Sequence, residues 1–106
     1  MAKCAENLKK LPGISHLAAI NLLDAEGNLL ASIENKPGSQ GSLAVYNHLA
    51  QTYGAITPDA AKKGLEIFAE HSEDAKAHPG KHPNITRLIE LIETGATLRT
   101  KHVFAT

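Results

Sequence analysis

The sequence has a single cysteine and no net charge. Cys4 has no partner within the chain, and a lone thiol is typical of proteins in a reducing compartment. Eleven basic side chains balance eleven acidic ones, so no broad electric field attracts nucleic acid or anionic lipid. Neither nucleic acid nor a membrane surface is therefore an expected partner.

Long apolar runs are also missing. The longest, Leu17 to Leu23, is interrupted by Asn21 and is far shorter than the roughly 20 residues of a membrane-spanning helix. The opening residues, Met1 to Asn7, carry no apolar run after the lysine, so we expect no secretory signal. With the lone thiol, these absences predict a cytoplasmic protein.

The remaining composition is that of an ordinary globular domain. The 106 residues, 42% of them hydrophobic, suffice for one hydrophobic core. No repeat, low-complexity tract or long linker divides the chain. We expect a single domain over residues 1–106.

Three segments have strand character. Apolar residues at 16–23 and 29–34 surround the turn residues Asp24 to Asn28, which predicts a β-hairpin. Residues 97–104 alternate between two faces and predict a third strand. These strands would form a small antiparallel sheet.

Apolar residues at helical spacing predict three main helices, at 43–53, 58–77 and 85–94, and a short helix within 4–11. Helices joined to an antiparallel sheet define an α+β fold, with the helices on one face. Ser42, Thr57 and Asn84 are the expected N-caps of the main helices. The expected core positions are Tyr46 and Tyr53 of the first helix and Ala61, Leu65, Phe68, Ser72 and Ala75 of the second.

Residues 71–84 hold three of the six histidines beside two carboxylates. Imidazole changes charge nearest neutral pH and is a common metal ligand. His71, Asp74 and His82 are candidate ligands for zinc, because the turn at Pro79-Gly80 could return His82 toward the helix. In such a hydrolytic site His78 would be the acid or base.

A structural role explains the same segment. In this interpretation the charged residues form the solvated end of a helix, while the two His-Pro dipeptides shape a loop. However, three acids near a helix C-terminus oppose the macrodipole. A functional site therefore stays an alternative interpretation of this segment. We expect no bound cofactor, with zinc as the alternative.

A glycine-rich loop precedes the first main helix. Its Lys36, Gly38, Ser39, Gly41 and Ser42 could direct N–H and hydroxyl groups at phosphate or a nucleotide. The lysine precedes the glycines and the Walker spacing is absent, so a capped strand-to-helix connection explains these residues equally. Cys4, with no histidine near it in sequence, is expected to be incidental.

Several segments together resemble a family of roughly hundred-residue bacterial proteins that has no assigned function. The resemblance rests on four segments: Asn7 to Pro12, Asp24 to Gly27, Pro37 to Tyr46, and Glu70-His71 followed by Ala77 to Ile85. It implies a bacterial cytosolic protein and supplies no catalytic residues. A fainter likeness, over Leu17 to Ser32, is to the first hairpin of roadblock-like regulatory domains, from which the helical second half departs.

Three functions follow from these patterns. The first is a small non-enzymatic interaction or regulatory module that self-associates, since a sheet of three short strands leaves an edge for a second copy. The alternatives are a metal-dependent or histidine-based hydrolase using the His71 to His82 segment, and phosphate or nucleotide binding at the Lys36 to Ser42 loop.

Overall fold

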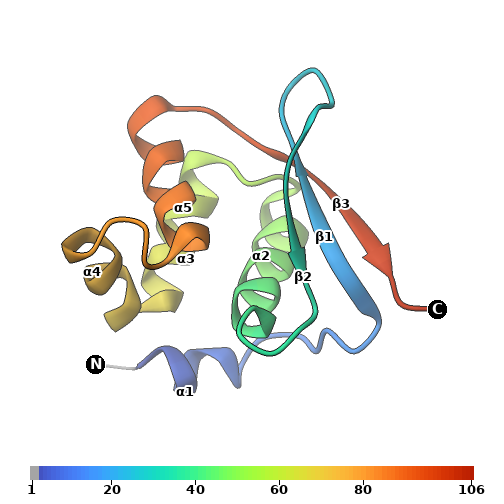
Figure 1. The fold of residues 1–106 in the computed structure, drawn as a ribbon, viewed down its shortest axis with the longest axis horizontal. Coiled ribbons are helices and arrows are strands. Elements are labelled where there is room, and N and C mark those ends of the chain that lie inside the picture. The colour runs from blue at the N-terminus through green and yellow to red at the C-terminus, as the bar shows by residue number, and fades with distance from the viewer. Residues whose placement is uncertain (1–2) are drawn as a thin grey trace.

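Three antiparallel strands form the sheet in the computed structural model, which describes residues 3–106 (Figure 1). β1 (Leu17–Leu23) lies between β2 (Leu29–Glu34) and β3 (Arg99–Phe104). The predicted α+β class, the hairpin and the C-terminal strand are all confirmed. The expectation about a secretory signal rests partly on Met1 and Ala2, which lie outside the described residues.

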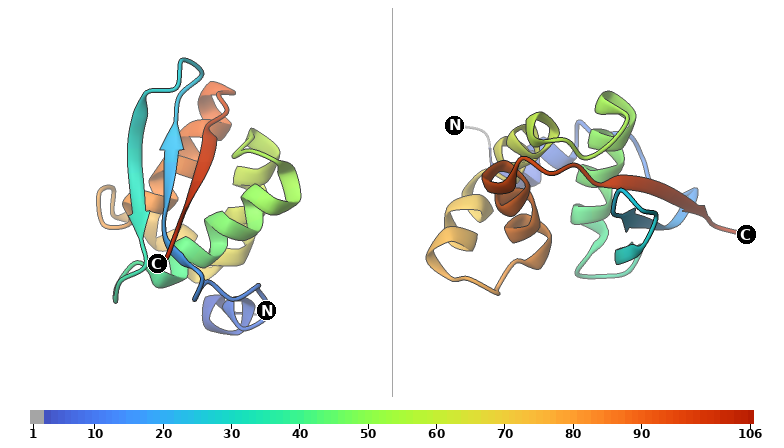
Figure 2. Two further views of the ribbon diagram at one scale, coloured as in Figure 1. Left: turned by 90° about the vertical axis from the view of Figure 1, so that its right-hand side faces the viewer. Right: turned by 90° about the horizontal axis from the view of Figure 1, so that it is seen from above.

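Only one face of the sheet is covered by helices. Ile20 pairs with Ile33 of β2 and with His102 of β3, and these side chains face the helical layer together with Leu22. Ala19 and Asn21 point to the opposite face because side chains alternate along a strand. In the left view of Figure 2 the three strands lie in front of the helices, and no helix of residues 3–106 covers them.

The helices form successive layers on one side of the sheet, to its left in Figure 1. α2 (Gln40–Tyr53) packs against β1 and β2, and α3 (Pro58–Phe68) packs against α2 and α5 (Pro83–Thr94). α1 (Cys4–Leu8) contacts α2 and α3, whereas α4 (Glu70–Ala77) contacts α3 and α5 at the outside.

The core fills the space between these layers. Thr57 caps α3 as predicted, because its hydroxyl accepts the N–H of Ala60 at 3.0 Å. Gly54 and Gly95 end α2 and α5 in the left-handed conformation, which glycine adopts readily. The largest fully buried side chains are those of Tyr46, Leu17, Ile20, Leu22, Leu43, Leu49, Ile56, Ile85 and Leu88.

The predicted single helix over 58–77 is wrong. The chain leaves helical geometry at Ala69, with φ 51° and ψ −116°, and α4 starts in a new direction. The Ser72 hydroxyl donates to the carbonyl of Leu65 at 2.7 Å, and the Ala69 N–H reaches the carbonyls of Leu65 and Glu66. These bonds satisfy the end of α3 while Phe68 and Ser72 stay buried.

Two predicted caps are also wrong. α2 begins at Gln40 and not after Ser42, and α5 begins at Pro83 with His82 at the N-cap and not Asn84. The Asn84 side chain instead accepts a hydrogen bond from Arg87 at 2.8 Å. Proline at the first helical position explains this earlier start.

The expected core residues are correct except for Tyr53 and Leu65. Tyr53 is 39% exposed, because the last turn of α2 projects beyond the core. Leu65 is only partly buried, because it lies at the edge of the buried face of α3, which is formed by Ala60, Ala61, Gly64, Ile67 and Phe68. Among the described residues, no helix has the length and apolar character needed to cross a membrane.

Candidate functional site

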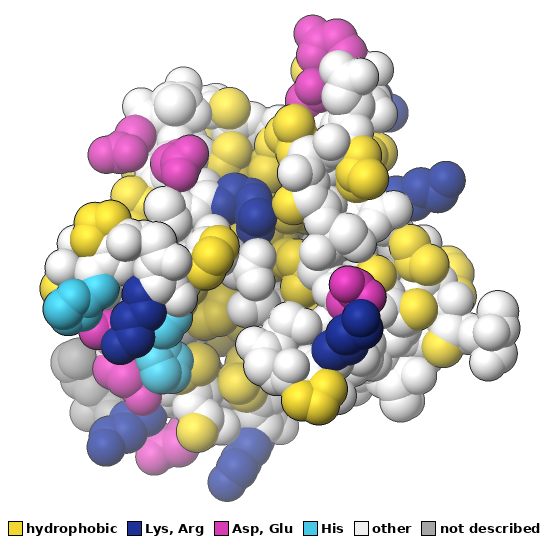
Figure 3. Space-filling model, in the orientation of Figure 1, with side chains coloured by type: hydrophobic (Ala, Val, Ile, Leu, Met, Phe, Trp, Pro, Cys, Tyr) yellow, Lys and Arg dark blue, Asp and Glu magenta, His cyan; other side chains and the backbone are white. Residues whose placement is uncertain are grey.

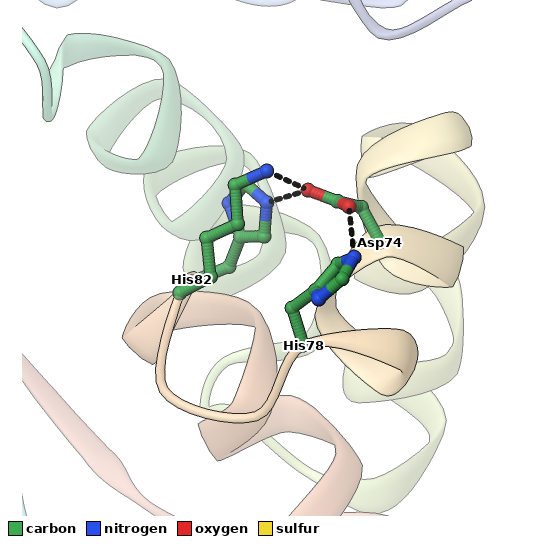
Figure 4. Close-up of polar contacts among 4 residues, drawn as sticks. Asp74, His78 and His82 are labelled. Atoms are coloured by element: carbon green, nitrogen blue, oxygen red, sulfur yellow. Dashed lines mark hydrogen bonds and ion pairs between the residues drawn. The ribbon is translucent and has the colours of Figure 1, made fainter.

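Asp74 is the centre of the histidine segment. Its Oδ2 atom lies 2.7 Å from Nε2 of His82 and 2.9 Å from Nζ of Lys81 (Figure 4). Oδ1 lies 3.8 Å from Nε2 of His78, on the other side of the carboxylate. The hydrogen bond from Lys81, followed by that from His82, lowers the pKa of Asp74 to about 2.

The predicted return of His82 across the turn is therefore observed. Pro79 and Gly80, the latter with φ 92°, reverse the chain between α4 and α5. His82 comes to lie beside Asp74 with its side chain 24% exposed, whereas that of His78 is 65% exposed. Asp74 thus orients His82 and leaves His78 largely in solvent.

His71 reaches the same place from the first turn of α4. Its ring centroid lies 5.6 Å from that of His82, with the ring planes tilted by 44°. In the space-filling view, histidine side chains gather beside lysine and acidic side chains on the surface formed by α4 and the loop after it (Figure 3). His71 and His82 therefore lie side by side, and His78 lies on the other side of Asp74.

These two imidazoles line a cavity of about 210 Å³. The opposite wall is formed by Gly38, Gly41 and Ser42, which belong to the glycine-rich loop and the first turn of α2. The apolar walls are the side chains of Cys4, Leu8, Phe68 and Ile85. The histidine segment and the glycine-rich loop, which the sequence presents as separate candidates, thus form one site.

The glycine-rich loop contributes only part of its predicted set. Lys36 pairs with Glu34 at 3.0 Å, and the Ser39 hydroxyl donates to the carbonyl of Glu34 at 2.6 Å. Neither residue lines the cavity. Gly41 has a packing role as well, because a Cβ atom there would lie 3.2 Å from Leu8 of α1.

The first turn of α2 has unused hydrogen-bond donors. Ser39 occupies the N-cap position, but its side chain makes no capping bond. Across residues 3–106, the backbone N–H groups of Gln40, Gly41 and Ser42 have no acceptor. Such a turn, with the positive end of the helix macrodipole, attracts anions.

Cys4 is a cavity residue that the sequence patterns missed. Its side chain is 4% exposed, and its N–H donates to Oε1 of Glu70 at 2.8 Å. Burial raises the pKa of the Cys4 thiol, and the charge of Glu70 raises it further. The thiol is therefore protonated at neutral pH, and no local motif near residue 4 indicates its contact with a cavity formed by residues distant in sequence.

The predicted zinc ligands do not form a ligand set. Within residues 3–106 there is no group of three or more His, Cys, Asp or Glu side chains placed to hold a metal ion. Asp74 and His82 contact each other directly, while His71 faces His82 through its ring. Zinc binding stays a prediction from the sequence.

A larger hollow, of about 680 Å³, lies between α1 and the junction of α3 with α4. Its charged walls are the side chains of Lys3, Lys63, Glu66, Glu70 and Glu73. Because both signs of charge line this hollow, it favours no particular ligand charge. The smaller cavity has the more specific chemistry.

Comparisons with known proteins place the chain in a family. Neither the curated proteins nor the solved structures include a match to it. A family model does match residues 4–102, which include every cavity residue. The chain therefore belongs to the bacterial family described as "Uncharacterized protein conserved in bacteria (DUF2322)".

Proposed function

We propose that this protein is a non-enzymatic module that binds a small anion in the cavity between α1, α2 and the α4–α5 loop. The observation that carries this proposal is the convergence of two imidazoles and an uncapped helix N-terminus on one cavity. Either group alone is common. Together they supply several donors for negative charge at a single place.

The anion would be bound mainly at the first turn of α2. The N–H groups of Gly41 and Ser42 donate to it, and the helix macrodipole adds roughly half a positive charge at that end. His71 and His82 supply further N–H donors, which become charge-assisted when the imidazoles are protonated. Asp74 supports this arrangement because its carboxylate lies 2.7 Å from Nε2 of His82 and holds that imidazole at the cavity wall.

The size and walls of the cavity define the ligand class. At about 210 Å³ the cavity is smaller than the roughly 300–1,000 Å³ of drug-sized sites. Leu8, Phe68 and Ile85 offer apolar contact to whatever accompanies the charged group. We therefore infer a ligand with one acidic group, phosphate or carboxylate, and at most a short aliphatic body.

Binding accounts for the site better than hydrolysis does. A cysteine nucleophile requires a thiolate, and the raised pKa of Cys4 keeps its thiol protonated. Among the described residues, neither Cys4 nor Ser42 makes a side-chain hydrogen bond to an imidazole. A free, protonated thiol is also consistent with the cytoplasmic location that we propose.

Calorimetric titration with sulfate tests this function, because sulfate stays doubly charged between pH 5 and 8, the range over which histidine titrates. Affinity should rise as the pH falls, because protonated imidazoles form charge-assisted hydrogen bonds with the anion. His71→Ala and His82→Gln should each weaken binding about tenfold or more at pH 6, since a hydrogen bond to a charged group contributes roughly 1.5–3 kcal/mol.

His78→Ala is the matched control for this titration. His78 belongs to the same segment and contacts Asp74, yet it does not line the cavity, so its loss should leave sulfate affinity within about twofold. Equal losses in all three variants would indicate a diffuse charge effect and contradict the proposal. Absence of binding to the wild-type protein at pH 6 would also overturn it.

A further inference from the structure

The two edges of the sheet have different chemistry. β2 and β3 are both edge strands, because β1 lies between them. Natural edge strands usually carry charged side chains that prevent pairing with another chain. β3 follows this pattern, since Arg99 and Lys101 are both exposed.

β2 has no such protection along most of its length. Residues 29–33 carry no charge and no proline, and Leu29 and Leu30 are 60% and 56% exposed. Glu34, at the end of the strand, is held by Lys36. In the left view of Figure 2, β2 forms the outer border of the sheet, and no strand or helix from the described part of the chain lies beyond it.

The backbone of β2 offers unpaired hydrogen-bonding groups at this border. The N–H of Asn35 donates to the carbonyl of Ala18 at 2.8 Å. In an antiparallel ladder, only every second residue directs its N–H and carbonyl groups at a given neighbouring strand. The backbone groups of Ile33 therefore point toward β1, whereas those of Ser32 and the N–H of Glu34 point outward. Ser32 therefore presents both a donor and an acceptor to another strand.

We propose that a second copy of this chain pairs with β2, antiparallel about a two-fold axis beside Ser32, to give a continuous six-stranded sheet. At the axis, the N–H and carbonyl of Ser32 in each copy bond those of the other copy. The uncharged residues then face one another, and each Glu34 lies opposite Leu30 of the other copy. This surface is independent of the cavity.

The charges favour a second copy at β2 and oppose one at β3. In the proposed pairing the two Glu34 residues lie four positions apart, roughly 14 Å along the strands, which exceeds the screening length of about 8 Å at physiological salt. Pairing β3 with its copy would gather two arginines and two lysines, and like charges in adjacent strands are destabilising. β2 is therefore the self-complementary edge.

Sedimentation velocity over a concentration series tests this interface. The wild-type protein should show a species with the mass of two chains. Ser32→Lys and Ser32→Glu, at an exposed position, should each sediment as monomers because like charges meet at the axis. An equimolar mixture of the two variants should restore the dimer, since opposite charges then meet.

Val103→Lys is the matched control, because it adds the same charge on the same sheet face but at the β3 edge, where Val103 is 37% exposed. This variant should dimerise like the wild type. A wild-type protein that is monomeric at every concentration would overturn the proposal. Dimers that resist Ser32→Lys, or that Val103→Lys also disrupts, would overturn it equally.

Discussion

At the scale of single residues, Asp74 organises the candidate site. It holds His82 at 2.7 Å and Lys81 at 2.9 Å, and both come from the loop that precedes α5. The sequence indicates that His71, Asp74 and His82 lie together. In the structure Asp74 contacts His82 directly, which directs that imidazole toward the cavity next to His71.

The lowered pKa of Asp74 gives stability a specific pH dependence. The pKa falls from an ordinary 3.8 to about 2 in the folded protein, so the unfolded chain binds a proton more readily than the folded one. The stabilisation is complete above about pH 5 and is lost as the pH falls toward 2. Urea unfolding of Asp74→Asn should show a weaker dependence on pH over this range than the wild type.

Glu73→Gln provides the comparison for Asp74→Asn. Glu73 is the adjacent acid and makes only an exposed contact of 3.5 Å with Lys76, which contributes little. The free energy of unfolding of Glu73→Gln should therefore change with pH as that of the wild-type protein does. Parallel profiles for Asp74→Asn and the wild type would show that Asp74 is not held by its two neighbours.

At the scale of helices and strands, the sequence predicts what local chemistry controls. Thr57-Pro58 begins α3, Gly54 ends α2, and alternation marks β3, each through interactions within a few residues. The break at Ala69 has no such signal, because no glycine or proline stands there. It arises from burial of Phe68 and from the bond between Ser72 and Leu65, which depend on packing in three dimensions.

Replacing Ala69 by glycine tests whether this break is strained. Alanine at φ 51° is in a region that a side chain disfavours by about 1–3 kcal/mol. Ala69→Gly should therefore raise the free energy of unfolding by roughly 1 kcal/mol, after the greater backbone entropy of glycine is subtracted. Equilibrium denaturation measures this change directly.

Ala44→Gly provides the opposite expectation within α2. Ala44 lies inside a regular helix, where the same change costs about 1 kcal/mol. A gain at residue 69 with a loss at residue 44 supports a strained break. Equal losses at both positions would show that Ala69 bears no strain.

At the scale of the whole molecule, the layered arrangement brings the two candidate segments together. α2 lies between the sheet and the outer helices (Figure 1). Its first turn lines the same cavity as His82 in the loop that joins α4 to α5. Local patterns identify both segments as unusual. Their meeting could not be predicted, because it depends on the packing of elements far apart in the chain and on α1, whose Cys4 and Leu8 complete the cavity.

In the proposed site, the first turn of α2 and the two imidazoles bind one anion together. Chemical-shift mapping of the wild-type protein with sulfate at pH 6 tests it most directly. The amide signals of Gly41 and Ser42 should move along with the ring signals of His71 and His82, all with the same dissociation constant. Shifts confined to exposed lysines, or imidazole shifts without those of the α2 amides, would contradict it.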